Sequence, residues 1–226
     1  MSRNHFSSLN VPSRRKFLGA AAMTSGAVAS AQMAFGADLL RSTPSMALGP
    51  FYPIAKPLEA DADLTRLAGH SARAKGKVID LSGRVLDRHG MPVAGATIEL
   101  WQANAVGRYM HHGDTHDAPL DPDFQGYAQQ VTDADGRYRF LTIIPGAYPA
   151  GDYMRAKHIH FDVRGKWDRL VTQMYFRGDP LLGQDKTLSA DVHTSDVSKM
   201  PEEMYGHMGM AAAATPCQWA IVLRDG

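Results

Sequence analysis

Two histidines stand two residues apart in the stretch RAKHIHFDVRG. Apolar and polar residues alternate through this stretch, which predicts a β-strand. Side chains at positions i and i+2 point to the same face of a strand, so His158 and His160 are either a metal clamp or part of a solvated face. The pair alone does not distinguish these interpretations, and further ligands of a metal would have to come from elsewhere in the chain.

Two tyrosines in Gly- and Pro-containing segments are the candidate partners: Tyr109 in GRYMHH and Tyr148 in PGAYP. Proline fixes φ and restricts the residue before it, so the second segment can aim its phenol at the histidine face. Free tyrosine has a pKa near ~10, so phenolate is a stable ligand at neutral pH only beside a strongly Lewis-acidic ion. Hard anionic oxygen favours ferric iron over zinc or ferrous iron, and catalase haem is a precedent. Two phenols and two imidazoles therefore predict a ferric centre.

The same residues have ordinary structural interpretations. Tyr109 and Tyr148 would be packed core tyrosines in a protein without a metal, and Arg155 would pair with an acid such as Asp152. The constellation as a whole favours the metal centre. Three further histidines lie in a polar stretch that we expect to be a solvated loop rather than a second metal site: His111, His112 and His116.

The elements that must position these residues are predicted to be strands. From Lys77 onward, alternating runs rich in β-branched residues predict strands in VIDLSGRVLD, ATIELWQA, KHIHFDVRG and LVTQMYFRGD. DADG between YAQQVT and RYRFLTI predicts a hairpin. The polar stretch at 104–126 and the stretch IPGAYPAGDYMRA are predicted to be loops. Trp101 and Cys217 are expected to be buried packing residues.

Short strands, frequent turns and no strong helical pattern predict an all-β fold. We expect a β-sandwich of mostly antiparallel strands with long functional loops, over residues 76–226. Residues 38–75 contain the run LGPFYPIAKP, whose prolines exclude a regular helix, and they are expected to form an extended N-terminal arm.

The first 37 residues resemble an export signal. Arg14 and Arg15 precede Phe17, Leu18 and an Ala/Gly-rich apolar run, the pattern of a twin-arginine signal peptide. The alternative, a membrane anchor, is disfavoured because the apolar run is too short and too polar to span a bilayer. We expect a periplasmic or otherwise exported protein with no stable membrane insertion after cleavage.

Composition excludes several classes of function. One cysteine among 226 residues excludes an intramolecular disulfide and disfavours zinc–thiolate and iron–sulfur sites. The net charge of +1 gives no basic field for nucleic acid. Residues 1–37 contain four basic residues and no acidic one, so removing them leaves 20 basic and 23 acidic residues and a net charge of −3.

Several motifs occur together and in order: GPFYP, ELWQAN followed by GRY, DADGRYRFLTIIPGAYP, HIHF and LVTQMYFRGDP. From about Gly49 to Pro180 the chain resembles the intradiol ring-cleavage dioxygenases, of the protocatechuate 3,4-dioxygenase type. The resemblance implies that His158, His160 and Tyr109 bind ferric iron. It implies that Tyr148 is an axial ligand, which leaves the metal when substrate chelates and then acts as a base.

The resemblance also assigns roles around the metal. Arg155 would stabilise negative charge on the bound catecholate, and Gln173 and Tyr52 would line the substrate pocket. The implied reaction cleaves a catechol-type ring with O2 between its two hydroxyl-bearing carbons and gives a cis,cis-muconate-type diacid. Relatives of this type are generally oligomeric, so we expect a homo-oligomer.

One position departs from the family pattern, which commonly has proline after the arginine. Here Ala156 and Lys157 stand between Arg155 and His158. Lys157 alternates with His158, so a regular strand would turn it away from the metal. Two other functions remain as alternatives: an exported transthyretin-like binding protein without turnover, and a cupin-like enzyme that uses the His-x-His pair.

Overall fold

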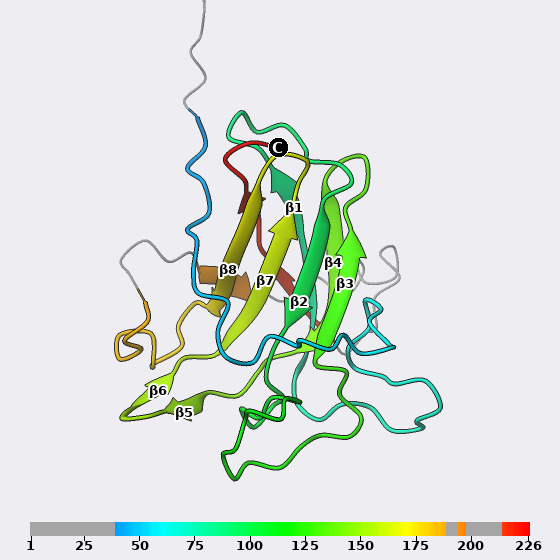
Figure 1. The fold of residues 1–226 in the computed structure, drawn as a ribbon, viewed down its shortest axis with the longest axis vertical. Coiled ribbons are helices and arrows are strands. Elements are labelled where there is room, and N and C mark those ends of the chain that lie inside the picture. Colours follow the sequence, from blue (N-terminus) through cyan, green and yellow to red (C-terminus); the bar gives the residue numbers. More distant parts are fainter. Residues whose placement is uncertain (1–38, 189–193, 198–213) are drawn as a thin grey trace, which may run out of the picture. The chain divides into compact units, whose positions relative to one another are not determined.

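The computed structural model describes residues 39–188, 194–197 and 214–226 (Figure 1). The predicted export signal at 1–37 lies outside the described residues. Among the residues described, no helix has the length and apolar character needed to cross a membrane.

The described part of the chain contains strands and no helix. The strands are β1 (Val78–Leu86), β2 (Thr97–Trp101), β3 (Tyr127–Val131), β4 (Arg137–Ile143), β5 (Tyr148–Ala150), β6 (Tyr153–Arg155), β7 (His158–Arg164), β8 (Arg169–Phe176), β9 (Thr194–Val197), β10 (Thr215–Gln218) and β11 (Ile221–Val222).

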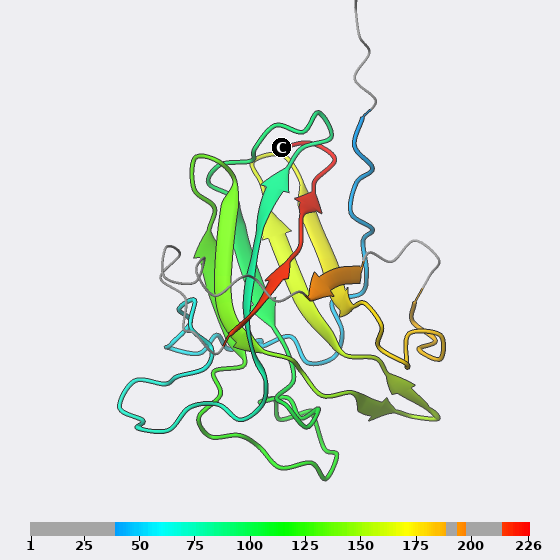
Figure 2. The ribbon, with the colours of Figure 1, turned by 180° about the vertical axis from the view of Figure 1, so that it is seen from behind.

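The strands form two layers (Figures 1 and 2). One layer has the order β3-β2-β7-β8 and is antiparallel throughout. The other contains β4, β1, β10 and β11, with β1 between β4 and β10. The short strand β9 pairs with β8 and with β10 and so joins the layers at one edge. The predicted sandwich of mostly antiparallel strands is confirmed; only β1–β10, β1–β11 and β8–β9 are parallel among the described pairs.

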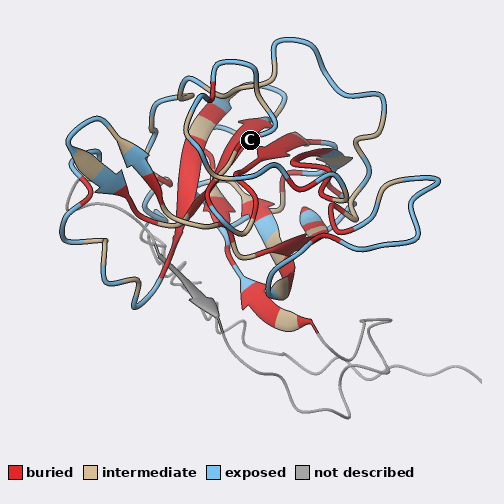
Figure 3. Ribbon diagram, turned by 90° about the horizontal axis from the view of Figure 1, so that it is seen from below, coloured by how far each residue is buried: buried red, intermediate tan, exposed pale blue. Residues whose placement is uncertain are grey.

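The core lies between the layers and follows the period of two expected for strands. Figure 3 shows the buried residues concentrated on the strands. On β7 the core-facing residues are Ile159, Phe161 and Val163, all fully buried. The alternate residues of β7, which include both histidines, point to the opposite, outer face of the sheet. The sandwich interior therefore supplies rigidity, whereas the predicted chemistry lies outside it.

The N-terminal arm encloses that outer face. Residues 39–77 contain no helix and no strand beyond an isolated bridge between Asp63 and Leu141. The arm is fastened to β8 by backbone and side-chain hydrogen bonds, from Met46 N to Val171 O at 2.8 Å and from Gln173 Nε2 to Ala47 O at 2.9 Å. This cover explains why β7 is buried on both faces from His158 to Val163.

The predicted hairpin around DADG is wrong as a strand pair. The turn is present, closed by a hydrogen bond from Gly136 N to Asp133 O at 2.9 Å, with Gly136 at a φ of 71°. The flanking strands do not pair with each other, because β3 pairs with β2 and β4 pairs with β1. Each strand completes its own layer, so the turn carries the chain across the sandwich.

The predicted loop at 144–156 is also corrected. It contains the hairpin β5–β6, in which Tyr148 stands directly opposite Arg155. Gly151, with a φ of 66°, lies in the connecting turn. Pro149 and Gly151 hid this element from a pattern analysis, because both residues are depleted in strands. The hairpin links a candidate ligand and a candidate catalytic arginine in one small unit.

Candidate metal centre

Three segments place the four predicted ligands at one end of the sandwich. Tyr109 comes from the long loop after β2, Tyr148 from β5, and His158 and His160 from the start of β7. The four side chains are buried, each with no more than 5% of its surface exposed.

The structure brings these four rings into contact. His158 Nε2 lies 3.2 Å from His160 Nε2 and 3.4 Å from the Tyr109 hydroxyl. The Tyr148 ring centroid is 5.5 Å from that of Tyr109 and 5.6 Å from that of His158. Two imidazole nitrogens and two phenol rings therefore share one small buried volume.

Strand register explains how the histidines are oriented. Trp101 is the cross-strand partner of His160, and their rings stack with centroids 4.8 Å apart and an interplanar angle of 13°. Trp101 was expected to be a packing residue; it is buried, but it also fixes the plane of His160. His158 Nδ1 lies 2.6 Å from the Ala156 carbonyl oxygen, which can only accept. His158 therefore carries its proton on Nδ1 and directs the Nε2 lone pair into the cluster.

The donors fit a cation. His160 Nδ1 is buried, and no hydrogen-bond partner for it is found among the described residues. Burial, and then Arg155, lower the pKa of His158 to about 3. Burial, and then His158, hold the pKa of His160 well below its usual range. Both imidazoles are thus neutral and able to ligate.

The two phenols would need a bound cation in order to ionise. Burial, and then the neighbouring Tyr148, raise the pKa of Tyr109 well above its usual value. Burial also raises the pKa of Tyr148, although Arg155 opposes the rise. Neither phenol ionises at neutral pH unaided, so the site suits an ion acidic enough to stabilise phenolate.

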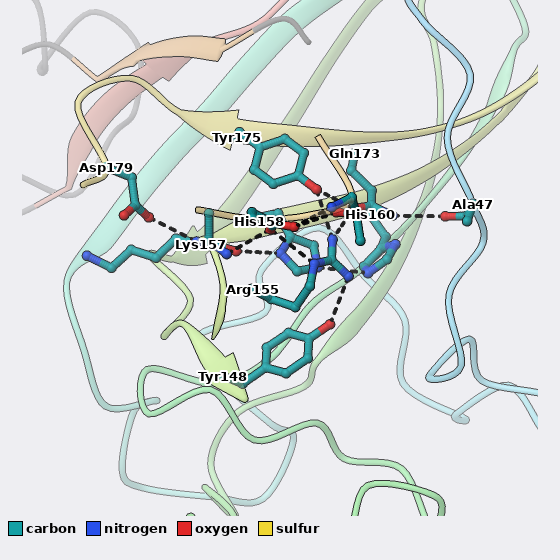
Figure 4. A network of polar contacts seen from close by, with 12 residues as sticks. Ala47, Tyr148, Arg155, Lys157, His158, His160, Gln173, Tyr175 and Asp179 are labelled. Carbon is teal, nitrogen blue, oxygen red and sulfur yellow. Dashed lines mark hydrogen bonds and ion pairs between the residues drawn. The ribbon is translucent and has the colours of Figure 1, made fainter. Parts of the chain in front are cut away.

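Arg155 lies beside the cluster in a network of polar contacts (Figure 4). Its Nη2 donates to Gln173 Oε1 at 2.7 Å and to the Tyr175 hydroxyl at 2.9 Å, and its Nη1 lies 3.4 Å from the Tyr148 hydroxyl. The predicted alternative, a pair with Asp152, is wrong. Asp152 accepts from Lys186 on the surface at 2.6 Å.

The carboxylate that pairs with Arg155 is Asp185, at 3.1 Å from Nε. Sequence reasoning missed both Asp185 and Tyr175. Tyr175 had a signal, because it stands two residues after Gln173 on the same strand face and opposite His158 in the register. Asp185 had none, since it lies in an irregular segment after β8.

Gln173 and Tyr52 occupy different places. Gln173 stands opposite His160 in the register, and its amide joins the arm at Ala47 to Arg155. The Tyr52 hydroxyl donates to Glu99 Oε2 at 2.7 Å, and its ring meets Trp101 edge-on at 5.0 Å. Gln173 therefore lies in the arginine network, and Tyr52 borders the cluster through Trp101.

The histidine-rich loop is only partly solvated, as a correction to the sequence-based expectation. His112 is exposed, but His116 is partly buried beside Tyr148, with ring centroids 6.4 Å apart. Asp114 accepts from the Tyr109 backbone N–H at 2.7 Å and contacts His116 Nδ1 at 2.6 Å. The loop thus holds the Tyr109 backbone in place.

A cavity of about 170 Å³ adjoins the cluster on the side of Tyr109 and Trp101, under the arm. Its lining includes Phe51, Met110 and Tyr127. A larger hollow of about 680 Å³ lies over the other layer, lined by residues such as Ser82 and Arg139, and contains none of the predicted site residues. The candidate site is therefore identified by its tyrosine and histidine side chains and not by the volume of its cavity.

Comparison with known proteins places the chain among dioxygenases. A family model described as "Dioxygenase" matches residues 48–225. The protocatechuate 3,4-dioxygenase beta chain of Burkholderia cepacia is 55% identical over 130 residues, covering 55% of this chain and 55% of the relative. The hydroxyquinol 1,2-dioxygenase of Rhizobium sp. (strain MTP-10005) is 32% identical over 181 residues, covering 71% of this chain and 58% of the relative. The chain thus spans little more than half the length of these curated relatives.

Solved structures share the fold. The dioxygenase domain of a carbohydrate-binding fusion protein from Streptomyces sp. SirexAA-E matches with a TM-score of 0.61 and 24% identity, covering 82% of this chain and all of that domain. Wild-type catechol 1,2-dioxygenase of Acinetobacter radioresistens matches with a TM-score of 0.66 and 22% identity, covering 83% of this chain and 64% of that one.

Proposed function

The chain belongs to this dioxygenase family, and from that membership we propose that it is a non-haem ferric intradiol dioxygenase acting on a catechol-type ring. The observation that carries the proposal is the buried cluster of Tyr109, Tyr148, His158 and His160 with Arg155 at its edge. The family model covers the whole of this cluster.

Ferric iron fits the donor set. Two neutral imidazoles and two phenols would hold it, and phenolate oxygen suits a hard trivalent ion better than a divalent one. When bound, the ion would act as a Lewis acid and template that keeps the phenols ionised and orients a catechol through both of its oxygens. The cupin-like alternative is weaker because it leaves the two buried phenols without a role.

Tyr148 supplies the base. Burial raises the pKa of its phenol, so the phenolate form of Tyr148 would readily take a proton from a catechol hydroxyl. The proton is then held on the Tyr148 hydroxyl oxygen, 3.4 Å from Arg155 Nη1.

Arg155 supplies a fixed positive charge. Gln173 and Tyr175 hold its Nη2, which leaves Nη1 on the side of the cluster. A preorganised cation in a buried site stabilises negative charge that develops on the ring as it donates electrons. The burial of Tyr109, Tyr148 and both histidines would limit the access of water to this charge.

The overall reaction needs only a catechol and O2. The bond between the two hydroxyl-bearing carbons breaks, and each of these carbons becomes a carboxyl carbon. Both atoms of O2 enter the product, a cis,cis-muconate-type diacid, so no external reductant is consumed. The cavity beside Tyr109 offers room for substituents on the ring.

The purified protein provides the first test. We expect a reddish colour, because phenolate bound to ferric iron absorbs visible light, and we expect one O2 consumed per ring opened in a panel of catechol, protocatechuate and hydroxyquinol. Product identification distinguishes cleavage between the hydroxyls from cleavage beside them. A colourless, iron-replete protein, or binding of catechols without turnover, would contradict the proposal and favour a transthyretin-like binding protein.

We further propose export by the twin-arginine route, supported by Arg14 and Arg15 before an apolar run. A protein that must hold iron benefits from folding before export. The homo-oligomer expected from the resemblance stays a prediction.

A further inference from the structure

Asp185 is a buried carboxylate that accepts hydrogen bonds from three other residues. Oδ2 accepts from Arg155 Nε at 3.1 Å and from the Ala156 backbone N–H at 2.9 Å. Oδ1 accepts from the Thr187 hydroxyl at 2.6 Å and from the Thr187 backbone N–H at 3.0 Å. The carboxylate is therefore fixed by its own segment on one side and reaches the arginine on the other.

Asp185 completes the set of contacts that orient Arg155. Nε donates a hydrogen bond to Asp185, and Nη2 donates to Gln173 and Tyr175. Nη1 is left toward Tyr148 at 3.4 Å, a long contact that a bound ligand can replace. Hydrogen bonds hold two of the three nitrogens of the planar guanidinium. Because the group is rigid, these bonds also fix the direction of the third nitrogen, Nη1.

We propose that Asp185 is a positioning residue for Arg155, which it holds with Nη1 directed into the metal centre. The inference rests on the proposed function, because it assumes that Arg155 stabilises charge on the substrate. Both side chains are buried, with 7% and 0% of their surfaces exposed. An uncompensated charge at this depth is strongly unfavourable, so losing the carboxylate would release the guanidinium from its place.

The proposal also gives a role to the departure at Ala156. Proline, which the resembled family commonly has after the arginine, lacks a backbone N–H and could not donate a hydrogen bond to Asp185. Ala156 offers the N–H that Asp185 accepts. The next residue, Lys157, gives its N–H to Asp179 Oδ2 at 2.9 Å, and its side chain points away from the histidines (Figure 4).

Asp179 provides a matched control. It lies on the same segment after β8, and it also accepts backbone N–H groups, from Lys157 and from Leu181. The arginine is bonded by Asp185 and not by Asp179 among the described contacts. Replacing each carboxylate by its isosteric amide therefore separates the positioning of Arg155 from support of the strand.

The experiment compares Asp185→Asn and Asp179→Asn with the wild-type, iron-loaded full chain. Asp185→Asn places an amide N–H against two donors. We expect it to keep its iron and visible band while kcat falls about 10- to 100-fold with KM within a few-fold, a loss typical of disturbed positioning. Asp179→Asn should stay within about twofold of wild type by the same reasoning.

Two results would overturn the inference: unchanged kcat in Asp185→Asn, or an equal loss of kcat, iron and thermal stability in both variants. A wild-type chain that turns over no catechol would instead overturn the proposed function. Crystal structures then still test the positioning role. It requires Arg155 to leave Gln173 and Tyr175 in Asp185→Asn but not in Asp179→Asn.

Discussion

At the residue scale, the two phenols are held differently although both are buried. Tyr109 is anchored by its backbone, which donates to Asp114. Tyr148 lies in a three-residue strand opposite Arg155, whose guanidinium is within 3.4 Å of its hydroxyl. The positive guanidinium of Arg155 stabilises negative charge on the Tyr148 oxygen even when that oxygen is not bound to a metal ion. Tyr148 is therefore the phenol that we propose as the base, whereas Tyr109 would remain a ligand of the ion.

The first residue-scale prediction is Tyr148→Phe. Removing this hydroxyl takes away one phenolate and the proposed base, so we expect a shifted visible band and turnover lower by about 10²- to 10⁴-fold, the range for general base catalysis. Absorption spectra and oxygen uptake provide the measurement. Tyr138→Phe is the matched control, because Tyr138 is equally buried but bonds Trp219 O in the other layer. An unchanged spectrum in Tyr148→Phe would exclude that residue as a ligand.

At the element scale, the arm comes close to the candidate metal centre at Gly49. Gly49 has a φ of 80°, and a Cβ placed there would lie 3.0 Å from His160 Cε1. The His160 ring is also stacked on Trp101, which limits how far it can move. The arm can cross the outer face of the sheet at this distance only because this residue has no side chain.

Gly49→Ala tests that contact, with Gly69→Ala as its control. Gly69 has a φ of 82° but nothing within 4 Å of an added Cβ. Both variants should lose about 1–2 kcal/mol of unfolding free energy through left-handed strain. Only Gly49→Ala should also weaken iron retention or shift the visible band, measured by metal analysis and spectroscopy. Equal iron retention in the two variants would mean that the arm does not constrain His160.

The strands and the site differ in how far sequence predicts them. Alternation over nine residues in β1 and seven in β7 gives strand identity and face directly, which is why His158 and His160 could be placed together. The β5–β6 hairpin has three residues per strand, too few for a period to be seen. Asp185 lies 30 positions after Arg155, in an irregular segment, and no local sequence pattern indicates a contact between them.

At the scale of the whole molecule, the apolar core and the chemistry occupy different faces of one sheet. The core cluster uses the inner residues of β7, such as Ile159 and Phe161, and the aromatic cluster around Tyr109 uses the outer face. We therefore expect the sandwich to fold without bound iron. This separation is compatible with the proposed export of a folded protein.

The last prediction concerns that export. Replacing Arg14 and Arg15 by lysine keeps the charge of the N-terminus but removes the arginine pair. In a bacterium with an active twin-arginine translocase, we expect the variant to accumulate in the cytoplasm as folded, iron-containing protein. Cell fractionation with visible absorption is the measurement. Lys16→Gln is the control, since it removes one neighbouring charge and leaves the pair. If the double-lysine variant were exported as efficiently as the Lys16→Gln control, the arginine pair would not be the export determinant, and a general secretory or anchoring segment would replace it.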